Sequence, residues 1–117
     1  MHELSICLAL LDQVHAIAIQ HNSKSVCRIS VINGPLSGVE TVLLEQAYTI
    51  ACQGTVADEA QLEIESETLR VRCTICGLES DVVANNLTCQ HCGDWHTEII
   101  QGDRLLLAQV ELEPNEN

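Results

Sequence analysis

Apolar residues recur every three or four positions along the first twenty residues of the chain. The members of this stripe are Leu4, Cys7, Leu8, Leu11, Val14 and Ala18. Such spacing places side chains on one face of an α-helix, where they can pack against a core. The pattern therefore predicts an amphipathic helix of about five turns that ends near His21 and Asn22.

A second stripe with helical spacing runs through residues 39–51. Ser37 stands just before it and Glu40 follows three residues later, which is the spacing of a capping box at a helix start. Gly54 lies beyond the last apolar position, and glycine commonly ends a helix there. We therefore predict a second helix with Ser37 as its N-cap.

Three other segments alternate apolar and polar residues, the period of a half-buried strand. They cover residues 25–32, 61–71 and 103–112. The predicted order is helix, strand, helix, strand, cysteine-rich segment and strand. We expect an α+β fold in which a small three-stranded sheet packs with two helices and a four-cysteine module is inserted before the last strand.

The cysteine-rich segment contains two C-x2-C pairs, Cys73/Cys76 and Cys89/Cys92, with twelve residues between them. Four thiolates on two turns can surround one tetrahedral ion at about 2.3 Å per Zn–S bond. A module this small cannot bury a core of its own, so a bound ion would take that role. The spacing predicts a zinc-ribbon-like site. The alternatives are two disulfides and an Fe–S or rubredoxin-like iron site.

The net charge of the chain limits the kinds of molecule that it is expected to bind. The formal net charge is −12, and no Lys or Arg lies between Cys73 and Gly102. Zinc ribbons that bind nucleic acid need a basic face for the phosphates, so the charge argues against a nucleic-acid partner. It is compatible with a basic protein surface or a metal cation.

The remaining cysteines, Cys7, Cys27 and Cys52, stand in apolar patterns, where a free cysteine behaves as a small hydrophobic residue. The N-terminus lacks a basic segment of the kind that opens a signal peptide, and no apolar run approaches the length of a membrane span. We therefore expect a cytoplasmic protein with reduced thiols and no membrane partner.

The first three residues, Met1, His2 and Glu3, form a second candidate metal site. The α-amine of Met1, the amide nitrogen of His2 and its imidazole Nδ1 can chelate one ion, and the amide or carboxylate of Glu3 can supply a fourth donor. Planar nitrogen donors suit Ni(II) or Cu(II). The alternative is a histidine placed there by chance, with Glu3 serving only as a negative charge at a helix start.

The opening Met-His-Glu-Leu-Ser-Ile resembles the HypA family of hydrogenase nickel-incorporation proteins. The resemblance extends to residues 36–39, the acidic strand at 62–65, both cysteine pairs and the segment that begins at Gly102, so that it covers nearly the whole chain. It implies a cytosolic nickel metallochaperone rather than an enzyme. The implied domains are a nickel-binding α/β domain at 1–70 and 104–117 and a zinc-binding domain at 71–103.

The resemblance also implies roles for individual residues. His2 would be the essential ligand of Ni(II), the transferable cargo, with help from the Met1 amine and Glu3. The ligands implied for a structural Zn(II) are Cys73, Cys76, Cys89 and Cys92. The implied partners are a HypB-type GTPase and the large subunit of [NiFe] hydrogenase, and some family members also serve urease.

The chain departs from family members that carry a histidine close after each cysteine pair. Gly77 and Leu78 follow the first pair, whereas His91 lies inside the second pair and His96 comes after it. His96 is thus a candidate additional nickel ligand, and a surface histidine beside Trp95 is the alternative. We expect a monomer or weak homodimer; the competing function is a zinc-stabilised protein-interaction adaptor without metal transfer.

Overall fold

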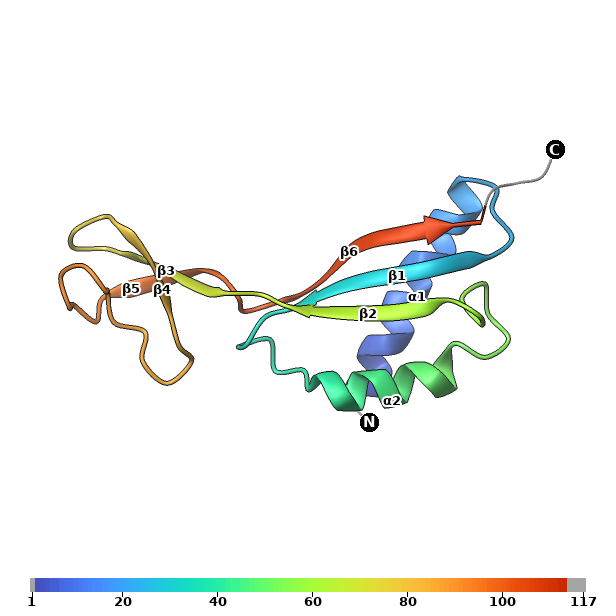
Figure 1. Cartoon of the computed structure of the whole chain (residues 1–117), viewed down its shortest axis with the longest axis horizontal. Helices are drawn as coiled ribbons and strands as arrows, with labels where there is room; N and C mark the ends of the chain where they lie inside the picture. The colour runs from blue at the N-terminus through green and yellow to red at the C-terminus, as the bar shows by residue number, and fades with distance from the viewer. Residues whose placement is uncertain (1, 114–117) are drawn as a thin grey trace. The chain divides into compact units, whose positions relative to one another are not determined.

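The computed structural model describes residues 2–113, and this part of the chain contains two helices and six strands (Figure 1). Their bounds are α1 His2–Gln20, β1 Val26–Asn33, α2 Thr41–Ala51, β2 Gln61–Ser66, β3 Leu69–Cys73, β4 Glu79–Val82, β5 Thr97–Gln101 and β6 Leu105–Leu112. The chain divides into two compact units. The first comprises Met1–Val31, Val39–Ile64 and Leu107–Asn117, and the second comprises Ile32–Gly38 and Glu65–Leu106.

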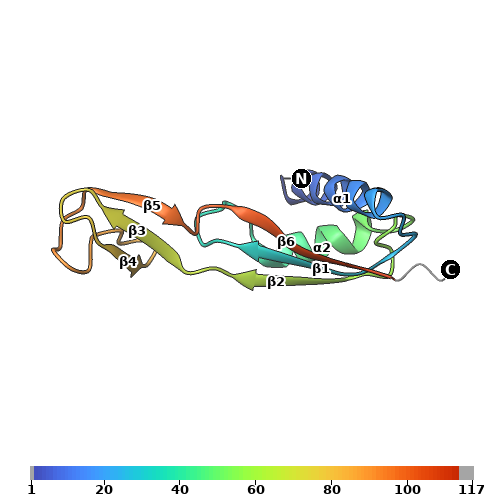
Figure 2. The same ribbon diagram turned by 90° about the horizontal axis from the view of Figure 1, so that it is seen from above.

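The first unit is built on a three-stranded sheet in the order β2-β1-β6. In Figure 1 the arrows of β1 and β2 point the same way and that of β6 points the opposite way. Both helices lie on one side of this sheet (Figure 2). The expected α+β architecture of two helices on a small sheet, together with a four-cysteine segment later in the chain, is confirmed.

The core of this unit is aliphatic. Helix α1 buries Cys7, Leu11, Val14 and Ala18, which are spaced by four, three and four residues as the apolar stripe predicts. They meet residues of α2 and the sheet, among which Val31 and Leu44 are fully buried. Tyr48 of α2 is also buried, and its hydroxyl donates to the carbonyls of Ala57 at 3.2 Å and Ala60 at 3.0 Å.

The start of α2 differs from the expected capping box. The helix begins at Thr41, its N-cap is Glu40, and no side chain caps it. Ser37 instead donates its hydroxyl to Asn33 Oδ1 at 2.5 Å, while Gly38 adopts φ +80°. A hydrogen bond to the end of β1 thus competes with the helix for the Ser37 side chain. At the other end Cys52 is the C-cap, and Gly54 lies two residues further on with φ +76°.

The exposure of Cys27 and the hydropathy of helix α1 both differ from expectation. Cys27 is exposed, because the buried positions of β1 are Val26, Ile29, Val31 and Asn33. Helix α1 has the expected length of about five turns and ends at Gln20, but it is more apolar than expected. With 19 residues and a mean hydropathy of 1.3 it is the one helix in residues 2–113 that is long and apolar enough for a membrane span, a weak signal that a core helix or a signal sequence also gives.

The second unit contains a sheet that the sequence pattern did not predict. Its order is β4-β3-β5, and both pairs are antiparallel. The alternating segment at 61–71 is divided between the two sheets, since β2 ends at Ser66 and β3 begins at Leu69. Cys73 at the end of β3 pairs with Thr97 at the start of β5, so this sheet brings the two cysteine-rich turns toward each other.

Candidate metal centre

The two cysteine pairs form turns of the same geometry. After Cys73 the chain turns so that the N–H of Gly77 donates to the Cys73 carbonyl at 3.0 Å. After Cys89 the N–H of Gly93 donates to the Cys89 carbonyl at 2.9 Å. Gly77 and Gly93 adopt φ +77° and +79°, a conformation that side chains other than glycine rarely take. Glycine after each pair is therefore what closes each turn.

Each turn points backbone N–H groups at the first sulfur of its pair. The N–H groups of Ile75 and Cys76 each lie 3.4 Å from Cys73 Sγ, and Cys89 Sγ accepts from His91 at 3.4 Å and Cys92 at 3.5 Å. These donors stabilise a thiolate. The Cys76 N–H lowers the pKa of the Cys73 thiol, and the N–H groups of Cys92 and His91 lower the pKa of the Cys89 thiol to about 6.

The four sulfur atoms converge on one point. Cys73 Sγ lies 3.5 Å from Cys92 Sγ, Cys76 Sγ lies 3.6 Å from Cys89 Sγ, and all four lie within 4.8 Å of one another. Sulfurs at the corners of a tetrahedron with Zn–S bonds of about 2.3 Å would be about 3.8 Å apart. A disulfide needs about 2.05 Å. The spacing therefore fits four ligands of one ion, and all seven cysteines of the chain are free of disulfides.

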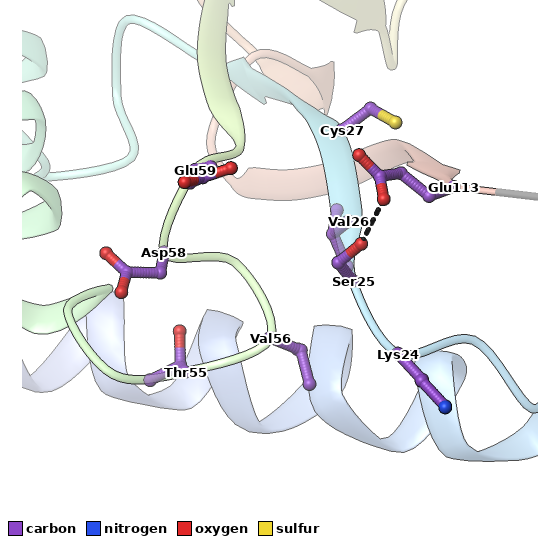
Figure 3. A pocket seen from close by; sticks show the side chains of 9 residues that line it. All are labelled: Lys24, Ser25, Val26, Cys27, Thr55, Val56, Asp58, Glu59 and Glu113. Atoms are coloured by element: carbon purple, nitrogen blue, oxygen red, sulfur yellow. Dashed lines mark hydrogen bonds between the residues drawn. The ribbon is translucent and has the colours of Figure 1, made fainter.

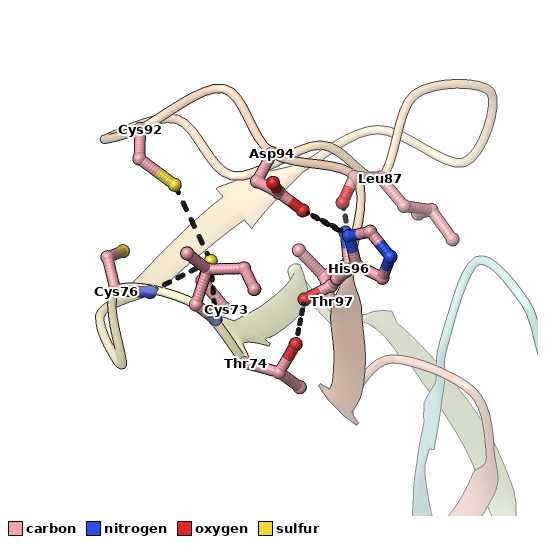
Figure 4. A network of polar contacts seen from close by, with 9 residues as sticks. Cys73, Thr74, Cys76, Leu87, Cys92, Asp94, His96 and Thr97 are labelled. Atoms are coloured by element: carbon pink, nitrogen blue, oxygen red, sulfur yellow. Dashed lines mark hydrogen bonds and ion pairs between the residues drawn. The ribbon is translucent and has the colours of Figure 1, made fainter.

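A polar network supports the second turn (Figure 4). Asp94 Oδ1 accepts from the backbone N–H of His96 at 2.7 Å and lies 2.6 Å from His96 Nδ1. The carbonyl of His96 accepts from the N–H of Thr74 at 2.9 Å and from its hydroxyl at 2.7 Å. Because Thr74 lies inside the first pair, these bonds tie the two turns together. The sequence pattern gave no sign of this role for Thr74 or Asp94.

Comparison with known proteins gives the family. Residues 1–112 match a family model described as "Hydrogenase/urease nickel incorporation, metallochaperone, hypA". The chain belongs to the HypA family. The hydrogenase maturation factor HypA of Nitrosospira multiformis is 49% identical over 96% of this chain and 97% of its own length. The HypA of Aquifex aeolicus is 43% identical over 97% of this chain and 98% of its own.

Two solved structures share the fold. The solution structure of the Ni metallochaperone HypA from Helicobacter pylori superposes with a TM-score of 0.71 and covers 94% of this chain and 96% of its own. A second HypA solution structure gives 0.77 over 97% of each chain. Both are 23% identical to this sequence, so the likeness concerns the fold.

The residues predicted to bind nickel in this HypA-family chain are divided between the two units. His2 is exposed and is the first residue of α1, Glu3 is half-buried in the next position, and Met1 lies outside the described residues. His96 belongs to the second unit, where Asp94 holds its Nδ1. Within residues 2–113, the four cysteines are the one group of three or more metal-ligating side chains that converge.

The first unit also contains a surface cavity of about 390 Å³ (Figure 3). It is lined by Lys24, Ser25, Val26, Cys27, Thr55, Val56, Asp58, Glu59 and Glu113. Ser25 donates its hydroxyl to the Glu113 carboxylate at 2.6 Å, which ties the start of β1 to the residue after β6. None of the predicted metal ligands lines the cavity, and its lysine and carboxylates do not converge as a set of metal ligands.

Proposed function

We propose that this chain is a nickel metallochaperone that binds Ni(II) at its N-terminus and delivers it for maturation of the large subunit of [NiFe] hydrogenase. The observation that carries the proposal is the match to the HypA family over residues 1–112. Relatives named hydrogenase maturation factor match it over nearly their full length. Delivery rather than catalysis is the role we infer, so the chain itself is not an enzyme.

The proposed nickel ligands are the Met1 amine, the amide nitrogen and imidazole Nδ1 of His2, and Glu3. His2 is exposed at the first position of α1. The first N–H groups of a helix have no carbonyl partner within the helix. Coordination through the amide nitrogen of His2 therefore breaks no helical hydrogen bond. Nitrogen donors in a planar arrangement suit Ni(II), and Cu(II) would compete for them.

The proposed ligands of a resident zinc ion are Cys73, Cys76, Cys89 and Cys92. Their convergence fits a tetrahedral thiolate site. Such an ion would link the two turns and leave no open position for water or substrate, a purely structural role. The N–H groups directed at Cys73 and Cys89 would hold these sulfurs as thiolates ready for the metal.

These ligand assignments divide the chain into two metal-binding domains. We propose that residues 1–70 and 104–117 form the nickel-binding domain and that residues 71–103 form the zinc-binding domain. A HypB-type GTPase and the hydrogenase large subunit are the proposed partners, in the cytoplasm, with the chain as a monomer or weak homodimer. His96 stays a candidate additional ligand, because the exposed imidazole still has Nε2 when Asp94 holds Nδ1.

The experiment is a Ni(II) titration of untagged, zinc-loaded protein that begins with its native Met1. The variants are His2→Ala and, as a matched control, His15→Ala, which removes an exposed histidine from the same helix. We expect His2→Ala to lose nickel binding while its zinc content and helical signal stay unchanged, and His15→Ala to bind like the parent. Equal nickel binding by His2→Ala would overturn the nickel assignment and favour a zinc-stabilised adaptor.

A further inference from the structure

The one tryptophan of the chain lies on the surface. The sequence has no Phe and a single Trp, yet Trp95 is 72% exposed while the buried core is built from aliphatic residues, cysteines and Tyr48. Exposing an indole to water forgoes the gain from burying its large apolar surface. Tryptophan is also the residue type most enriched among the anchors of protein interfaces. Trp95 is therefore a candidate anchor for a partner.

The ring of Trp95 is held in place. Its indole stacks on the imidazole of His96, with ring centroids 3.7 Å apart and planes inclined by 27°. Asp94 in turn holds His96 through both the backbone N–H and Nδ1 (Figure 4). The carbonyl of Trp95 itself accepts from the N–H of Thr97 at 2.9 Å. A partner would meet an oriented ring, which lowers the entropy cost of binding.

The segment that presents Trp95 is also fixed at both ends. On one side the N–H of Cys89 donates to the carbonyl of Asp94 at 2.8 Å. On the other side the hydroxyl of Thr97 donates to the carbonyl of Leu87 at 2.7 Å. The two hydrogen bonds from Thr74 to the carbonyl of His96 then attach this segment to the first cysteine turn. These hydrogen bonds thus fix the position of the Trp95 segment within the second unit.

The chain segment that contains Trp95 is acidic. No Lys or Arg occurs between Cys73 and Gly102, and the acidic residues in that stretch are Glu79, Asp81, Asp94 and Glu98. Glu79 and Asp81 already pair with arginines of β3. Asp94 stands next to Trp95, its side chain is 32% exposed, and its bonds to His96 use only Oδ1. A complementary partner carries positive charge.

We propose that Trp95 and Asp94 form a docking point for an arginine side chain of a partner protein. A guanidinium is planar, so it can stack on the exposed face of the indole while one of its N–H groups donates to the Asp94 carboxylate. A lysine ammonium lacks this planar face. The proposal goes beyond nickel binding, because it needs neither His2 nor the cargo.

The test uses the whole zinc-loaded chain and its tryptophan fluorescence. Trp95 is the single tryptophan of the sequence, so the emission reports on this residue. The probe is the blocked peptide Gly-Arg-Gly-Arg-Gly, compared with its lysine counterpart at about 0.15 M salt to screen non-specific attraction. We expect a saturable change in Trp95 emission with the arginine peptide and binding weaker by at least about threefold with the lysine peptide. No saturable change with the arginine peptide would overturn the proposal.

Variants separate the anchor from general attraction to an acidic protein. Calorimetric titration of the arginine peptide should show at least about fivefold weaker binding to Trp95→Ala, with partial recovery in Trp95→Phe. Asp94→Asn should weaken binding by a similar factor, whereas Glu45→Gln, the same charge change at an exposed site of α2, should not. Equal losses for Asp94→Asn and Glu45→Gln, or parent-like binding by Trp95→Ala, would overturn the docking point. Zinc content checks folding, and because neither the peptide nor the readout involves nickel, the result does not depend on the proposed function.

Discussion

Cys73 Sγ and Cys92 Sγ lie 3.5 Å apart, although 19 positions separate the two residues in the chain. Neither residue belongs to the other's C-x2-C pair. Their approach depends on the pairing of β3 with β5, which sets Cys73 opposite Thr97. The convergence of the four cysteines therefore depends on the strand pairing of the second sheet.

Replacing one member of the cysteine cluster should release the metal and unfold the second unit. We expect Cys73→Ala to lower the zinc content from about one ion per chain to near zero. Trypsin should then cut at Arg70 and Arg72, which lie in β3, at least about tenfold faster. Cys27→Ala is the control, because Cys27 is exposed and lies outside the cluster. Retention of zinc by Cys73→Ala would contradict the ligand assignment.

Chelation of the metal should affect the two units differently. Trp95 lies in the second unit, whereas α1 and α2 lie in the first. Removing zinc with a chelator should therefore change the tryptophan emission while leaving most of the far-UV helical signal in place. Adding zinc back should restore the emission. Parallel loss of both signals would instead show that the first unit needs the metal as well.

The close crossing of Gly34 and Gly102 should tolerate no side chain. The N–H of Gly34 donates to the Arg104 carbonyl at 3.0 Å, and that of Leu36 donates to the Gly102 carbonyl at 2.9 Å. A Cβ on Gly34 would overlap the backbone carbonyl of Gly102. We expect Gly34→Ala to lower the free energy of unfolding by about 3 kcal/mol.

The control for this substitution is Gly38→Ala. Gly38 adopts φ +80°, but a Cβ there would meet no atom within 4 Å. Its cost should be the conformational cost alone, about 1 kcal/mol. Urea unfolding measures both variants. If Gly34→Ala is no less stable than Gly38→Ala, the backbone segments at Gly34 and Gly102 can move apart to accommodate the added Cβ.

Burial of Tyr48 should make stability depend on pH in the alkaline range. Burial, followed by the nearby Cys52 and Cys7, raises the pKa of Tyr48 from 10.0 to about 12. Because the folded-state pKa lies above the unfolded one, this stabilisation is complete below pH 10 and is lost as pH rises toward 12. Two pKa units correspond to about 2–3 kcal/mol.

Tyr48→Phe isolates this contribution. At neutral pH the variant should be less stable by about 1–2 kcal/mol, because it loses the hydrogen bonds to Ala57 and Ala60. Above pH 10 the difference from the parent should shrink, since phenylalanine has no proton to lose. Urea unfolding at a series of pH values measures this, and a constant difference across the range would contradict the raised pKa.

The features that could be predicted from the sequence depend on residues close together in the chain. The buried face of α1 follows its helical stripe, and the glycines after Cys76 and Cys92 close turns whose geometry depends only on adjacent residues. The sequence also indicated the family, because the N-terminal triplet and the cysteine spacing are read directly along the chain. The sequence pattern does not predict β4 and β5, since segments of four and five residues carry little alternation of their own.

The sequence by itself indicated which residues are candidate metal ligands and where the helices and the three longer strand segments lie. Its charge also argued against a nucleic-acid partner. Only the tertiary structure decided which sulfurs approach each other, that Ser37 bonds to Asn33 instead of capping α2, and that Trp95 is presented to solvent. The physical reason is the distance along the chain over which each effect acts. Periodicity and turn chemistry act over a few neighbouring residues, whereas these outcomes depend on strand pairing and side-chain competition between segments far apart in the chain.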